Sequence, residues 1–182
     1  MFGPIWDRWN ALPPTEQVRR SIEANEAFVT RVEQTSDEQR DRVLLAAFGS
    51  DRDLAGLLTM RLGELAVHAW DTAVALDDTA TVSADAVDLL VDELTATAGR
   101  AGNSAPGVEP VTVVTTDPSR AFVLEVGDGV TLEPNGDAGP DPLVLPAEAL
   151  VRLVYGRLDA DHTPAGLDDP RLATLRTVFP GF

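Results

Sequence analysis

One long stretch with helical periodicity, from residue 53 to about residue 76, constrains the fold more than any other part of the sequence. Gly56 and Gly63 are its only helix-weakening residues. At about 100° per residue its apolar side chains gather on one side of a helix: Leu54, Leu58, Leu62, Leu65, Ala69, Ala73 and Leu76. The sequence therefore predicts a long amphipathic helix here, in a helical part of the protein.

The rest of the chain divides into a helical and a mixed part. Apolar spacing predicts further helices at residues 15–34, 83–98, 146–157 and 169–178, and alternation with turn residues predicts strands at 111–115, 121–126, 130–133 and 143–145. The Asp-Asp-Thr break at residues 77–79 is the predicted boundary. We thus expect an α+β protein with a helical part at 1–78 and a small α+β domain at 79–182.

Composition limits the kind of partner. A formal net charge of −16 disfavours binding to nucleic acid and to membrane surfaces, and its simplest effect is to keep the protein in solution. The chain has no cysteine, so any thiol chemistry needs a thiol brought in by a small molecule.

No run approaches the roughly 20 apolar residues of a membrane span, and the first four residues lack the pattern of a signal peptide. We expect a cytoplasmic protein. All 14 basic residues are arginine, a bias that fits a GC-rich genome such as an actinobacterial or halophilic one.

The best candidates for chemistry are Glu64 and His68. Residues four apart project from the same side of a helix, so a carboxylate and an imidazole can converge on one divalent ion, zinc among them. The spacing alone also suits a purely structural pair. Asp71, three residues after His68, is a candidate to orient the imidazole ring or to act as a surface cap.

The segment around this pair, RLGELAVHAWD at residues 61–71, resembles the metal-binding segment of the mycothiol-dependent maleylpyruvate isomerase and DinB-like families. The passage from residue 143 to 157 is similar to the sterol-carrier-protein-like second domain of the isomerases. The resemblance implies a DinB-like four-helix bundle that holds zinc through an early histidine together with Glu64 and His68. It also implies mycothiol as thiol co-substrate, attacking an electrophile such as maleylpyruvate, in an isomerase or S-transferase.

The chain departs from this family pattern at the first ligand, because no histidine precedes His68. We therefore expect either an N-terminally truncated bundle that lacks its first two helices, with the natural start upstream of Met1, or a reduced relative with an incomplete site. In both cases we expect little isomerase activity of the chain alone and a tendency to form homo-oligomers. Arg157, at the end of a predicted helix, is expected to interact with the helix dipole or, alternatively, to bind a substrate carboxylate. His162 is expected to be a solvated loop residue.

Two hypotheses of different classes remain. The first is a metal-binding protein of the mycothiol-dependent type, with Glu64 and His68 as ligands of zinc or another divalent metal. The second is a non-catalytic α+β binding or interaction protein, in which the Glu-His pair is structural.

Overall fold

The computed structural model describes residues 3–40, 42, 45–47 and 50–181. The chain forms two compact units, Met1–Ala55 and Gly56–Phe182. The predicted domain boundary at residues 77–79 falls inside the second unit, and it stays a prediction about the domains of the protein. None of the described helices is long and apolar enough to cross a membrane.

The first unit consists of helices and one short hairpin. Its elements are α1 (Gly3–Asn10), α2 (Pro14–Glu33), α3 (Asp37–Arg40), β1 (Leu45–Ala47) and β2 (Ser50–Arg52), with the two strands antiparallel. Pro14, the first residue of α2, is well suited to a helix start. An N–H group at this position would have no acceptor within the helix, so proline, which has no N–H, loses no hydrogen bond there. The predicted helix at 15–34 is confirmed, whereas α1 and the hairpin were not predicted.

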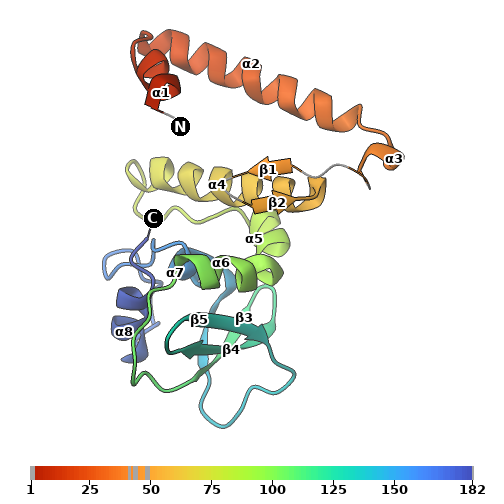
Figure 1. The fold of residues 1–182 in the computed structure, drawn as a ribbon. Helices are drawn as coiled ribbons and strands as arrows, with labels where there is room; N and C mark the ends of the chain where they lie inside the picture. Colours follow the sequence, from red (N-terminus) through yellow and green to blue (C-terminus); the bar gives the residue numbers. More distant parts are fainter. Residues whose placement is uncertain (1–2, 41, 43–44, 48–49, 182) are drawn as a thin grey trace. The chain divides into compact units, whose positions relative to one another are not determined.

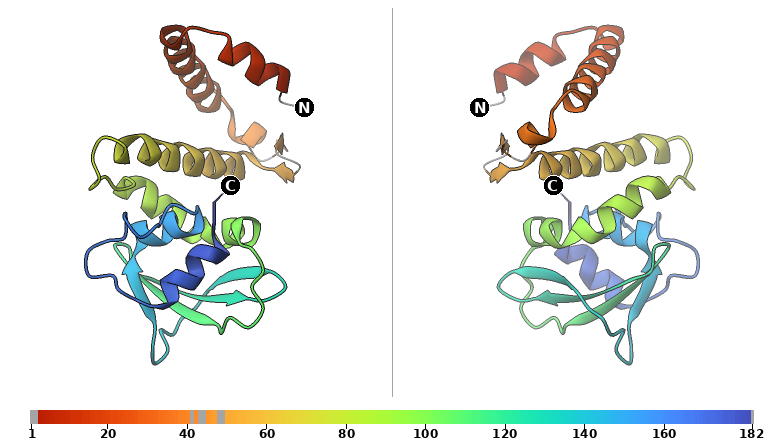
Figure 2. Two further views of the ribbon diagram at one scale, coloured as in Figure 1. Left: turned by 90° about the vertical axis from the view of Figure 1, so that its left-hand side faces the viewer. Right: turned by 90° about the vertical axis from the view of Figure 1, so that its right-hand side faces the viewer.

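The second unit is built around a four-stranded sheet with helices on one side (Figures 1 and 2). Its elements are α4 (Leu54–Val74), α5 (Ala84–Leu90), the 3-10 turn η1 (Val91–Glu93), α6 (Leu94–Ala101), β3 (Val111–Thr116), β4 (Arg120–Val126), β5 (Val130–Pro134), β6 (Leu143–Pro146), α7 (Ala147–Val154) and α8 (Arg171–Val178). The sheet order is β5-β4-β3-β6, and only β3 and β6 run parallel. The predicted α+β class is confirmed.

The core lies between the sheet and the helices that cover it. Residues alternate along β3, so that Val111, Val113 and Thr115 are buried while their neighbours are less so. Seven of the eight residues of α7 are buried, because this helix packs inside the unit between the sheet and other helices. The alternation and the helical spacing in the sequence predicted these elements to within a few residues of their ends.

Helix α4 approaches the end of α7 closely at Gly63. A Cβ atom on Gly63 would lie 2.1 Å from the hydroxyl oxygen of Tyr155. Burial raises the pKa of the Tyr155 phenol, although a hydrogen bond with Thr97 acts in the opposite direction. Because Gly63 has no side chain, the Tyr155 ring can pack against α4 at this position, which directly precedes Glu64.

Candidate functional site

Three polar side chains of α4 form a row with His68 in the middle. The Nε2 atom of His68 lies 3.5 Å from Oε2 of Glu64, and its Nδ1 atom lies 3.0 Å from Oδ2 of Asp71. The hydroxyl of Thr72 donates to the carbonyl of His68, which is an ordinary contact one helical turn apart. The imidazole is therefore flanked by carboxylates on both of its nitrogen atoms.

Arg157 joins this row from a position 86 residues further along the chain. Its Nε and Nη2 atoms donate to Oδ1 and Oδ2 of Asp71, each at 3.2 Å. Its Nη1 atom donates to the carbonyl oxygen of Tyr155 at 2.7 Å. The two predicted ligands and the predicted substrate-binding arginine thus lie in one hydrogen-bonded group, linked through Asp71.

The end of α7 explains how Arg157 reaches Asp71. Gly156 has φ of +70°, and the N–H groups of Arg157 and Gly156 donate to the carbonyls of Arg152 and Leu153, which forms a Schellman motif. A Cβ on Gly156 would lie 2.2 Å from the backbone nitrogen of Gly181, so glycine is required twice over. The predicted helix end at residue 157 is wrong, because this turn ends α7 at Val154 and directs Arg157 out of the helix.

The electrostatic setting keeps Asp71 ionised. Burial by itself raises the pKa of Asp71, but hydrogen bonds from Arg157 and His68 outweigh it and hold the pKa below its ordinary value. The side chains of His68 and Glu64 are 63% and 57% exposed, so both remain open to a ligand. Asp71, whose side chain is 34% exposed, therefore accepts a hydrogen bond at Nδ1 of His68, and the more exposed Glu64 lies next to Nε2.

The donor pair fits one half of a metal site. Two ligands at about 2.0–2.1 Å from a tetrahedral zinc ion lie roughly 3.3 Å apart, close to the 3.5 Å between Nε2 and Oε2. Imidazole nitrogen and carboxylate oxygen are also the chemical types that zinc accepts. Within the described ranges, no three His, Asp or Glu side chains are grouped so that they could hold a metal ion. Any further ligand has to come from outside this group.

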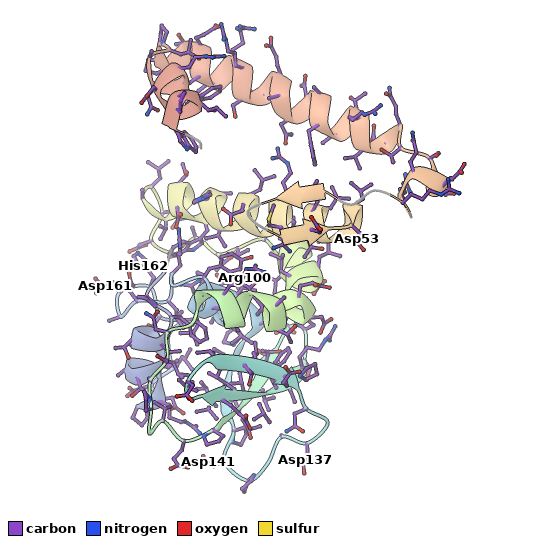
Figure 3. All side chains as sticks on the ribbon, in the orientation of Figure 1. Asp53, Arg100, Asp137, Asp141, Asp161 and His162 are labelled. Carbon is purple, nitrogen blue, oxygen red and sulfur yellow. The ribbon has the colours of Figure 1, made fainter. Side chains whose placement is uncertain are left out.

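A second charged cluster lies beside Trp70. The Nε and Nη2 atoms of Arg152 donate to both oxygens of Glu148, and Nη1 donates to the carbonyl of His162 at 2.6 Å. The guanidinium also lies 5.1 Å from the centre of the Trp70 ring, which the His162 ring contacts edge-on at 5.5 Å. His162 lies in the loop after α7, beside Asp161 (Figure 3), and its side chain is partly exposed, at 27%.

This cluster forms one wall of a cavity of ≈ 510 Å³ in the second unit. Val82, Val87 and Pro146 contribute apolar surface, and Glu148 and Arg152 contribute charge. The sequence analysis missed this pair, although its spacing of four residues on an otherwise apolar helix was a usable signal. The size lies within the ordinary range for a small-molecule pocket.

The comparison with known families decides the relationship of the N-terminal part. Residues 4–73 match the family described as the mycothiol maleylpyruvate isomerase N-terminal domain. This segment is similar to that family. It includes Glu64, His68 and Asp71, whereas Arg157 lies outside it. No curated protein and no solved structure matches the chain.

Proposed function

We propose that the chain is a metal-binding, thiol-handling protein of the mycothiol maleylpyruvate isomerase type, with Glu64 and His68 as ligands of a divalent ion and zinc as the first candidate. One observation carries this proposal. His68 Nε2 and Glu64 Oε2 face each other at 3.5 Å, while the other ring nitrogen is engaged by Asp71. Two electron-rich atoms at this separation gain from a cation shared between them.

The thiol has to come from a small molecule, because the chain contains no cysteine. The family name of residues 4–73 supports mycothiol as that thiol. A bound zinc ion would stabilise the thiolate form and so lower the pKa of the thiol. Glu64 and His68 would supply the protein donors, and a further ligand could come from the thiol itself or from a second subunit.

Arg157 is the proposed carboxylate-binding group for an electrophilic substrate. Three of its N–H groups are engaged by Asp71 and the Tyr155 carbonyl, and its Nη atoms carry further hydrogens that can donate. A planar guanidinium is well suited to a carboxylate. The identity of the electrophile within this class depends on contacts beyond these residues.

The second candidate function is a non-catalytic binding protein. The observation that favours it is the cavity of ≈ 510 Å³ beside Arg152 and Glu148, which can accept a small ligand without any metal. In that case Glu64, His68 and Asp71 contribute only to the structure of α4.

Cobalt substitution tests the first function. Co²⁺ takes tetrahedral sites like those of zinc, and a thiolate bound to it gives a charge-transfer absorption band. Because the chain has no cysteine, such a band can arise only from an added thiol. We expect the band when mycothiol is added to the Co²⁺-loaded protein, and its loss in Glu64→Gln/His68→Ala. A protein that gives no band, or an equal band in the double variant, would contradict the proposal.

A further inference from the structure

We infer that Asp71 is a positioning residue that fixes the tautomer and orientation of His68, and that Arg157 acts through Asp71. In this arrangement the Nδ1 atom of His68 carries the proton and Nε2 presents its lone pair next to Glu64. The inference rests on the proposed function in one respect only, the identity of the ion that binds to Nε2. The tautomer itself is a property of the metal-free chain.

The two carboxylates beside the ring are not equivalent. An ionised carboxylate only accepts hydrogen bonds, so a ring nitrogen bonded to it must carry the proton. Nδ1 lies 3.0 Å from Asp71 Oδ2, within hydrogen-bond range, whereas Nε2 lies 3.5 Å from Glu64 Oε2, beyond it. In the neutral imidazole the single proton therefore belongs on Nδ1.

Arg157 determines how the Asp71 carboxylate is turned. It contacts both carboxylate oxygens, so rotation about the last bond of the Asp71 side chain would break at least one hydrogen bond. The guanidinium is in turn held by the Tyr155 carbonyl and by the turn at Gly156. A chain of contacts thus runs from the end of α7 through Arg157 and Asp71 to the ring of His68. Carboxylates that orient a histidine in this way raise its basicity as a ligand.

The protein contains its own control. It has two histidines, and in the second one the Nδ1 atom of His162 lies 2.8 Å from Oδ1 of Asp159. The same type of contact therefore occurs away from α4, with a different carboxylate. A substitution at Asp71 should change the signals of His68 and leave those of His162 unchanged.

The test is ¹⁵N NMR of the metal-free full chain labelled on its histidine rings, at a pH high enough that both imidazoles are neutral. We expect the wild type to show protonated Nδ1 and unprotonated Nε2 for both rings. In Asp71→Asn the amide oxygen should remain with Arg157, which turns the amide NH₂ group toward Nδ1 of His68. That donor should switch His68 to the tautomer protonated on Nε2. His162 should keep its wild-type signals.

A second variant keeps the inference open to refutation if Asp71→Asn folds poorly. Arg157→Met leaves Asp71 in place but frees its carboxylate, so the ¹⁵N signals of His68 should move toward the average of both tautomers. Unchanged His68 signals in both variants, or a neutral His68 ring protonated on Nε2 in the wild type, would overturn the inference.

Zinc affinity, measured by competition with a chromophoric chelator, separates this inference from the proposed function. Loss of an orienting carboxylate weakens metal binding by about 10–100-fold in other proteins, and we expect a decrease of that order for Asp71→Asn. A wild type that binds no zinc but shows the tautomer switch refutes the proposed function and supports the inference. Tight zinc binding without any tautomer switch supports the proposed function and refutes the inference.

Discussion

The buried ion pair of α7 offers the largest single effect on stability. Among the described residues Arg152 is the one charged residue classed as buried, with a side chain only 4% exposed, and Glu148 is 14% exposed. In Arg152→Met the Glu148 carboxylate keeps one hydrogen bond, from the N–H of Val82, and loses its counter-charge. The His162 carbonyl loses its donor as well.

The expected loss is about 3–5 kcal/mol in the free energy of unfolding, the usual result when one member of a buried pair is removed. For a chain of this size that corresponds to a decrease in Tm of roughly 6–20 °C. Urea unfolding followed by tryptophan fluorescence measures it, in a Trp6→Phe/Trp9→Phe background where Trp70 is the remaining reporter. Trp70 is 5% exposed and lies beside Arg152, so its emission reports on the second unit.

Two controls make this prediction specific. Glu148→Leu/Arg152→Met removes both charges and should recover most of the lost stability. The exposed pair of Arg120 and Asp92 has similar contacts, with Nε–Oδ1 at 2.7 Å, and Arg120→Met should cost less than about 1 kcal/mol. A loss below about 1 kcal/mol in Arg152→Met, or no recovery in the double variant, would refute the reasoning.

Three further predictions concern single sites. Gly156→Ala should lower the free energy of unfolding by more than about 1 kcal/mol in urea titrations, because a side chain at φ +70° meets C-terminal backbone; an unchanged midpoint would argue against the turn. Gly63→Ala should also destabilise, and Tyr155→Phe should partly rescue it by removing the oxygen at 2.1 Å, as thermal melts of both variants can check. A hydrogen bond from Arg171 holds the pKa of Asp169 below its ordinary value, so the pair stabilises the folded protein fully when the pH is above that ordinary pKa. The difference in free energy of unfolding between the wild type and Asp169→Asn should therefore shrink as the pH falls through the lowered pKa, and a difference that does not change with pH would contradict this.

The regular elements could be predicted because their patterns are local. The apolar spacing of residues 53–76 gave α4, and alternation gave the four strands of the larger sheet. Helix α1 was not predicted, because it has only eight residues, including two tryptophans and a proline, and so few residues show no clear helical spacing of apolar side chains. The end of α7 was misplaced because Gly156 acts through the backbone of Gly181, a contact that no local pattern reveals.

The candidate site was only partly accessible to sequence reasoning. The spacing of Glu64 and His68 placed both on one face of α4, and their distance agrees with that expectation. The link from Asp71 to Arg157 spans 86 residues and depends on how α4 and the end of α7 meet at Gly63. The contact between the His162 ring and the Trp70 ring of α4 also joins residues far apart in the sequence, so no local pattern could predict it.

Zinc content shows whether Glu64 and His68 bind a metal ion. The wild type, Glu64→Gln/His68→Ala and the control His162→Gln should each be loaded with Zn²⁺, desalted and measured by elemental analysis. We expect close to one zinc per chain or per subunit pair in the wild type and the control, and almost none in the double variant. Equal zinc in all three proteins, or none in the wild type, would contradict a metal site at Glu64 and His68.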